Sequence, residues 1–186
     1  MFGARDVMVT PTDDKGALML GYISLPGRGE NDLFLAQVAR HLRGRMRLCG
    51  TVQTNIARAD RRKCDMDLQL LATGEVLRIS EDRGAQARGC TLDTHVLTQA
   101  VALSEAALDG ADLLLVNKFG KTEAEGNGFA PLVGEAICAG IPVLVGVNTL
   151  NMPAFQAFAD GHADALPADF VQVVDWCLKA QLRDAA

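Results

Sequence analysis

The sequence predicts an α/β fold, in which a mainly parallel sheet lies between two layers of helices. The first observation is that short apolar runs typical of buried strands alternate with longer segments of helical periodicity. The second is that 49% of the 186 residues are apolar, which is enough for one sizeable core. We therefore expect a single three-layer domain over residues 17–186, preceded by a mobile lead-in at residues 1–16.

The first part of this domain predicts a strand, a glycine-rich turn and a helix. Residues 17–24 are an apolar run that ends in the turn residues of "LPGRG", which indicates a buried strand. Residues 30–45 have helical periodicity, and Asn31 or Asp32 near their start is a typical N-cap. The apolar residues expected on one face of this helix are Leu33, Val38 and Leu42.

The middle of the chain predicts two strands, a hairpin and a helix. Residues 46–54 and 112–116 are the apolar runs of the two strands. Residues 64–80 contain two alternating runs about a glycine-containing turn, which predicts an inserted β-hairpin that adds an antiparallel edge. Residues 93–108 predict a helix that Asp93 can cap.

The last third predicts three helices and one more strand. The helix over 128–139 ends where Gly140 offers a C-terminal cap, and the apolar run 141–147 indicates a buried strand. Residues 152–161 have proline near a helix start, and residues 167–182 predict the final helix.

Composition and charge exclude several classes of function. A net charge of −5 and 5% aromatic residues provide neither the basic footprint nor the stacking platform of a nucleic-acid-binding protein. The longest apolar stretch is far short of the roughly 20 residues that span a bilayer, and the first residues lack the apolar segment of a signal peptide. We therefore expect a cytoplasmic protein without nucleic-acid or membrane partners.

The five cysteines and three histidines follow no disulfide or metal-binding spacing. We predict no metal site, and the sequence does not name a cofactor. Cys49, Cys138 and Cys177 lie in apolar runs and are expected in the core, whereas Cys64 and Cys90 lie among charged residues and glycine and are better candidates for reactivity or ligation.

Three loops are expected to meet, because ligands of parallel sheets bind beyond the carboxyl ends of the strands. These loops are 24–32, 117–127 and 148–152. The first has the strand–loop–helix layout of a P-loop, but against G-x-x-x-x-G-K-[ST] it places Ser24 at the first glycine, Glu30 at the lysine and Asn31 at the hydroxyl residue. A carboxylate 4 Å from a phosphate charge repels it by about 4 kcal/mol at an effective dielectric constant near 20.

Glu30 therefore argues against ordinary ATP binding, although Arg28 offers a displaced positive charge. A tight, self-capped turn is the alternative to any ligand role for this loop. Its candidate ligand-binding residues are Ser24, Gly27, Arg28, Gly29, Glu30 and Asn31.

Candidates in the other two loops are polar residues that follow predicted strands: Asn117, Lys118, Lys121, Glu123 and Asn148. Asn148 can contact a base or an oxyanion, or it can cap the next helix. Arg88 and Cys90 offer donors for a tetrahedral oxyanion such as molybdate, the alternative being a solvated basic loop. Asp65 and Asp67 share one face of a strand, where we expect a salt-bridged edge in preference to a cation site.

The order of these segments resembles that of small P-loop nucleoside triphosphatases of the thermostable, cancer-related type, over about residues 17–147. Relative to those enzymes, Glu30 replaces the phosphate-binding lysine, Asn117 the metal-holding aspartate and Lys118 the catalytic glutamate, whereas Gly120, Lys121 and Glu123 match. The resemblance thus implies a P-loop NTPase-like fold with a degenerate loop and weighs against magnesium-dependent hydrolysis. An acid thus replaces a lysine at position 30, and a lysine replaces an acid at position 118. These two opposite changes of charge suggest an ion pair between Glu30 and Lys118.

Almost the whole chain after the lead-in resembles an uncharacterised bacterial family, domain of unknown function 2478. The strings that carry this resemblance include "VQTN", "CDMDL", "RGC" and "GIPVLVGVN". Members of that family are often encoded beside molybdate-transport genes, which implies a link to molybdenum handling, but the resemblance implies no established activity.

Three hypotheses of function follow. The favoured one is a catalytically altered P-loop-NTPase-like protein that binds a nucleotide or small oxyanion, as an accessory or sensor in molybdenum homeostasis. The second is an active nucleoside triphosphatase with a remodelled site. The third is an assembly module without ligand, for which Phe170, Val174 and Trp176 on the last helix offer a homo-oligomer surface.

Overall fold

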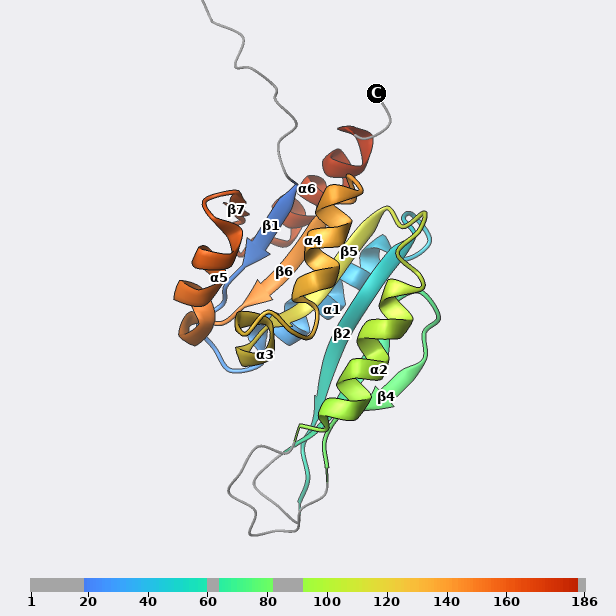
Figure 1. Cartoon of the computed structure of the whole chain (residues 1–186), viewed down its shortest axis with the longest axis vertical. Helices are drawn as coiled ribbons and strands as arrows, with labels where there is room; N and C mark the ends of the chain where they lie inside the picture. Colours follow the sequence, from blue (N-terminus) through green and yellow to red (C-terminus); the bar gives the residue numbers. More distant parts are fainter. Residues whose placement is uncertain (1–18, 60–63, 82–91, 184–186) are drawn as a thin grey trace, which may run out of the picture.

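The computed structural model describes residues 19–59, 64–81 and 92–183, and Figure 1 shows its course. The predicted lead-in at residues 1–16, and the candidates Arg88 and Cys90, lie outside these residues. Within them, seven strands form one sheet in the order β4-β3-β2-β5-β6-β1-β7. The strands are β1 (Leu20–Ile23), β2 (Leu48–Ile56), β3 (Asp65–Leu70), β4 (Val76–Arg78), β5 (Leu113–Phe119), β6 (Val143–Val147) and β7 (Ala163–Ala165).

The sheet is parallel in its centre and antiparallel at one edge. Strands β2, β5, β6, β1 and β7 run parallel to one another, whereas β3 pairs antiparallel with both β2 and β4. The predicted hairpin at 64–80 is therefore confirmed, and it extends the sheet beyond β2. From β1 the chain crosses over β6 and β5 to reach β2. After β3 and β4 it returns to the middle of the sheet as β5 and β6, and its last crossover leads to β7 beside β1.

Helices cover both faces, as predicted for a three-layer α/β domain (Figure 1). On one face, α1 (Glu30–Leu42) and α6 (Phe170–Arg183) pack over Leu113, Leu115 and Leu144. On the other, α2 (Thr94–Glu105), α4 (Ala130–Cys138) and α5 (Met152–Ala159) cover the alternate residues of the same strands. Two short helices, α3 (Lys121–Ala124) and the 3₁₀ helix η1 (Thr149–Asn151), follow β5 and β6.

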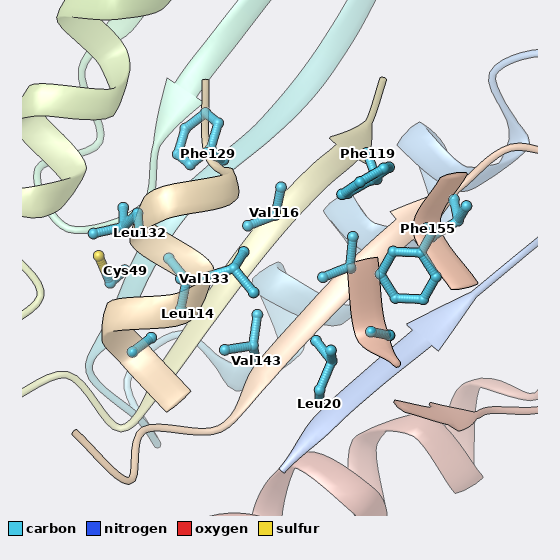
Figure 2. Packing of buried hydrophobic residues seen from close by; sticks show 14 of the residues in the cluster. Leu20, Cys49, Leu114, Val116, Phe119, Phe129, Leu132, Val133, Val143 and Phe155 are labelled. Carbon is cyan, nitrogen blue, oxygen red and sulfur yellow. The ribbon is translucent and has the colours of Figure 1, made fainter. Parts of the chain in front are cut away.

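The sequences of β5 and β6 are continuous apolar runs because both faces of these strands are covered by helices. Leu114 and Val116 of β5 and Val143 of β6 point toward Leu132 and Val133 of α4, as Figure 2 shows. Because the opposite side chains of β5 and β6 meet α1 and α6, both faces of each strand are buried, as expected of a central parallel sheet.

Several local expectations were wrong. Strand β5 continues to Phe119, so Asn117 and Lys118 belong to the strand. Helix α1 begins at Glu30 behind Gly29, whose φ of 78° is a left-handed conformation, and no side chain caps it. Leu33 is 70% exposed, because the buried face of α1 is formed by Leu35, Val38, Ala39 and Leu42.

Two expectations about exposure also change. Cys138 is exposed, because it lies in the last turn of α4 on the side away from the sheet, whereas Cys49 and Cys177 are buried as predicted. Val174 is buried, and Phe170 and Trp176 pack against the same core cluster. These three side chains of α6 thus stabilise the fold, and because Phe170 and Trp176 are only partly buried, the oligomer surface stays a prediction.

Candidate functional site

The three predicted loops do meet at the carboxyl edge of the sheet. Asn31 Nδ2 in α1 donates a 3.1 Å hydrogen bond to the carbonyl oxygen of Val147 at the end of β6. Asn151 Nδ2 in η1 donates a 3.1 Å bond to the carbonyl oxygen of Phe119 at the end of β5. The loops after β1, β5 and β6 are therefore fixed to one another through side-chain amides.

The glycine-rich loop after β1 is filled by side chains of its own helix. Glu30 Oε2 accepts a 2.9 Å hydrogen bond from the backbone N–H of Gly27, and Asn31 Oδ1 accepts one of 2.9 Å from Leu25. A Cβ at Gly27 would overlap the carboxyl group of Glu30. The glycine is thus needed for this close approach, and the carboxylate occupies N–H groups that an anionic ligand would use. Ser24 and Arg28 are exposed beside this turn.

Asp32, in the first turn of α1, organises the polar groups at the ends of β2 and β5. Its Oδ1 accepts a 2.8 Å hydrogen bond from Asn117 Nδ2, and its Oδ2 accepts one of 2.6 Å from Asn55 Nδ2. Asn117 is 3% exposed, and its Oδ1 accepts a 2.9 Å bond from the backbone N–H of Gln53. An amide is required at position 117, because the group must accept from Gln53 and donate to Asp32, and a carboxylate cannot do both.

The expected ion pair between Glu30 and Lys118 is wrong. The carboxylate of Glu30 turns back to Gly27, and no ion pair joins it to Lys118 among the ion pairs of described residues. The acid that contacts the end of β5 is Asp32, through Asn117. The sequence predicted Asp32 only as a helix cap. Its position two residues after Glu30, at the start of a helix that faces β5, is the signal that points to it.

Glu123 shapes the loop between β5 and α4. It is 6% exposed, and its two carboxylate oxygens accept hydrogen bonds from the backbone N–H groups of Gly120, at 2.9 Å, and Phe129, at 3.2 Å. A Cβ on Gly128, which has a φ of 58°, would overlap this carboxylate. The geometry therefore gives Glu123 a role in holding the loop, and its predicted role in ligand binding stays a prediction.

A pocket of about 650 Å³ opens between the β3–β4 hairpin, α2 and the end of β5. We call it the hairpin pocket. Its walls are mostly apolar and include Met66, Leu68, Ile79, Leu97, Phe129 and Leu150. Its size and its lining are within the range of small-molecule sites in proteins. The pocket was not predicted, because its walls come from segments far apart in the sequence.

The lining of the hairpin pocket also includes polar side chains. The exposed side chain of Lys118 lines it, as do Lys121, which pairs with Glu125 at 3.6 Å, and Asn148. Asn148 Oδ1 accepts a 3.0 Å hydrogen bond from the backbone N–H of Asn151, which confirms the capping role that the sequence allowed. The register of β5 and β6, with Phe119 opposite Val147, brings Lys118 and Asn148 to the same edge.

The thiols of Cys49 and Cys177 are buried, and the acids of the β3–β4 hairpin form ion pairs with arginines. Burial raises the pKa of Cys49 to about 11 and that of Cys177 to about 12. Arg78 bonds both Asp67 and Asp65, the latter at 2.9 Å, and Arg58 bonds Asp65 at 3.1 Å. The hydrogen bond that Arg78 donates to Asp67 raises the pKa of Arg78. The predicted salt-bridged edge is therefore confirmed.

The described residues contain neither a metal-ligand cluster nor a membrane-spanning helix. No group of three or more histidine, cysteine, aspartate or glutamate side chains there is arranged to hold a metal ion. No helix in that part of the chain is long and apolar enough to cross a membrane.

Comparison with known proteins identifies the family. The family model described as "Protein of unknown function (DUF2478)" matches residues 20–176, which is most of the chain. The chain belongs to this family. The part of the chain that matches the DUF2478 model contains the glycine-rich loop, Asp32, Asn117 and the residues that line the hairpin pocket.

One curated relative is the "Molybdenum import ATP-binding protein ModC 2" of Bradyrhizobium diazoefficiens (strain USDA 110). It is 36% identical over 149 residues, a stretch that covers 78% of this chain but 16% of the relative. The chain therefore spans less than a fifth of the length of that protein. No solved structure matched the chain.

Proposed function

We propose that this chain is a P-loop-NTPase-like protein that binds a nucleotide or small oxyanion without hydrolysing it, as an accessory or sensor in molybdenum homeostasis. The observation that carries the proposal is the contrast between two neighbouring places. The glycine-rich loop is filled by the carboxylate of Glu30, whereas the hairpin pocket beside it is open and has the exposed cation of Lys118 at its edge. The ligand in this proposal binds in the pocket.

Hydrolysis of a nucleoside triphosphate needs groups that neutralise the phosphates and position a metal ion and a nucleophile. At the carboxyl edge of this sheet, the acids are engaged with the protein itself. Asp32 accepts from two amides, Glu30 from Gly27, and Glu123 from two backbone N–H groups. These contacts support binding without turnover, because a metal ion or a phosphate would have to displace them.

The molybdenum part of the proposal rests on the relative. That protein is described as an ATP-binding protein of molybdenum import, and a segment like this chain forms part of it. In this proposal the chain acts beside such an importer in the cytoplasm, reporting ligand levels or adjusting transport. In this proposal the ligand is bound and released, and it leaves chemically unchanged.

Isothermal titration tests the proposal, with ATP, GTP, phosphate and molybdate each titrated into the purified chain, together with an assay of released phosphate. We expect saturable binding of at least one of these anions and no release of phosphate above the buffer blank. Lys118→Ala should weaken binding at least fivefold, since it removes an exposed cation that lines the pocket. Lys179→Ala is the control, because Lys179 is an equally exposed lysine on α6.

Two results would contradict the proposal. Release of phosphate that Lys118→Ala abolishes indicates an active triphosphatase with a remodelled site. Absence of binding for all four anions, together with a stable oligomer in light scattering, indicates an assembly module.

A further inference from the structure

Thr51 is an exception among the buried polar residues of this structure. It is 1% exposed, and in the part of the chain that the structure describes its hydroxyl has no hydrogen-bond partner. The other such residues are satisfied: Ser104 donates to Ala100, Asn117 uses both ends of its amide, and the carboxylates of Asp65 and Glu123 are bonded. Native proteins leave few polar groups buried without a partner, so this hydroxyl calls for an explanation.

Thr51 lines the hairpin pocket. Thr51 pairs with Leu70 of β3 and Val116 of β5, so it is in the middle of the sheet, with strands on both sides. The lysine at the pocket edge, Lys118, is exposed. The pocket walls therefore combine a buried threonine, apolar side chains and an exposed positive charge.

We propose that the hairpin pocket binds a nucleotide with its base inside and its phosphate outside. This inference rests on the proposed function and narrows its ligand to one class, a planar heterocycle that carries a phosphate. The edge of the base hydrogen-bonds the Thr51 hydroxyl, its faces lie against Leu68, Leu97 and Phe129, and the phosphate lies near Lys118 and Asn148. The glycine-rich loop takes no part.

Other ligand classes fit the same walls less well. A free oxyanion would be bound at the exposed end and would leave the apolar walls in contact with water. An acyl chain would cover those walls but would leave the Thr51 hydroxyl unpaired in an apolar site. A heterocyclic base has both apolar faces and a polar edge, and the pocket, at about 650 Å³, is large enough for a nucleoside monophosphate.

The position on the sheet separates this site from the glycine-rich loop. Asn117 of β5 is engaged with Asp32 on α1, which covers one face of the sheet. Asn117 and Lys118 both line the hairpin pocket, whose other walls include α2 on the opposite face. Neither Gly27 nor Leu25 lines it, so a ligand there does not need the N–H groups that Glu30 and Asn31 occupy.

The test compares ligands that differ only in the base. The 5′-monophosphates of adenosine, guanosine, cytidine and uridine, ribose 5-phosphate, inorganic phosphate and molybdate are each titrated calorimetrically into the full chain. We expect at least one nucleotide to bind more than tenfold tighter than ribose 5-phosphate. Thr51→Val keeps the shape but removes the hydroxyl, and it should weaken that nucleotide roughly fivefold to tenfold while phosphate binding stays the same.

Two further variants separate loss of binding from loss of folding. Thr51→Ser keeps a hydroxyl and should retain nucleotide affinity within about threefold, which a mere packing role of the Thr51 methyl group would not predict. Thr54→Val is the matched control, because Thr54 is an exposed threonine on the same strand. Lys118→Ala should weaken both nucleotide and ribose 5-phosphate, since it acts on the phosphate.

The proposal and the proposed function can fail separately. If phosphate or molybdate binds and no nucleotide binds tighter than ribose 5-phosphate, the base site is overturned and oxyanion binding stands. An unchanged nucleotide affinity in Thr51→Val overturns the base site as well. If none of the ligands binds, both are overturned.

Discussion

Asn117 Nδ2 and Asp32 Oδ1 lie 2.8 Å apart, and their hydrogen bond joins the end of β5 to the first turn of α1. The other end of the Asn117 amide accepts from Gln53 of β2, so a single buried side chain holds three elements in register at the carboxyl edge of the sheet. This relationship gives the carboxyl edge a defined shape without any ligand, and it can be tested by substitution.

Replacing the amide of Asn117 should destabilise the chain strongly. In Asn117→Asp, a second carboxylate faces Asp32 and the donor to Asp32 is lost, at a cost of about 3 kcal/mol at neutral pH. Urea unfolding followed by circular dichroism measures this. Asn55→Asp is the control, since Asn55 bonds the other oxygen of Asp32 but is exposed, and it should cost less than about 1 kcal/mol. Equal effects of the two substitutions would contradict the structural role assigned to Asn117.

Removing the carboxylate of Glu30 tests where the ligand binds. Glu30→Ala frees the N–H of Gly27 but does not touch the hairpin pocket, so the affinity for the pocket ligand should change less than about twofold. Calorimetric titration with the nucleotide or oxyanion that the wild-type chain binds is the measurement. A change of tenfold or more in either direction would mean that the glycine-rich loop contacts the ligand.

Gly128 and Gly126 form a matched pair for the role of Glu123. Both have positive φ, at 58° and 79°, so alanine at either position costs about 1 kcal/mol from backbone strain. A Cβ on Gly128 would also overlap the carboxylate of Glu123, whereas one on Gly126 meets nothing within 4 Å. Gly128→Ala should therefore be the more destabilising by about 2 kcal/mol in urea unfolding. Similar values for the two variants would show that the carboxylate of Glu123 moves freely.

The cysteines should differ sharply in reactivity. At pH 8 the exposed Cys138 should react with iodoacetamide within minutes, whereas Cys49 and Cys177 should remain unmodified in the folded chain because burial keeps them protonated and inaccessible. Peptide mass spectrometry identifies the modified residues. The urea-unfolded chain is the control, in which all three should react, and rapid labelling of Cys49 in the folded chain would contradict its burial.

The raised pKa of Cys49 also predicts a pH dependence of stability. A thiol whose pKa rises from 9.0 to about 11 on folding holds its proton more tightly in the folded state. Its contribution to stability is therefore complete below pH 9 and is lost as the pH rises from 9 toward 11. The free energy of unfolding should fall more steeply over that range in the wild-type chain than in Cys49→Ala. Parallel curves for the two chains would contradict the pKa assigned to this thiol.

The sequence was sufficient for the architecture because alternating apolar runs and helical segments are local signals. The meeting of the loops after β1, β5 and β6 at one edge was also predictable, since the carboxyl ends of parallel strands lie at the same edge of a sheet. It was wrong on how the charges pair. Residue types indicate that Glu30 and Lys118 are opposite in sign, but only the backbone determines that Glu30 reaches Gly27 three residues before it.

The hairpin pocket was beyond sequence reasoning for a different reason. Leu68 and Leu97 lie far apart in the chain from Phe129, and their patterns indicate only burial. The sequence likewise predicts only that Thr51 belongs to an apolar strand. That its hydroxyl has no partner is a property of the assembled sheet, which no local pattern contains.

Asn117 and Lys118 are consecutive residues of β5, and they share a peptide group. Both line the open pocket, and the amide of Asn117 also orients the first turn of α1 through Asp32. A molecule that holds Lys118 in place would also restrict the backbone that sets the position of Asn117. Occupancy of the pocket would then change how readily α1 moves, which gives this small domain a way to signal a bound molecule to whatever touches its opposite side.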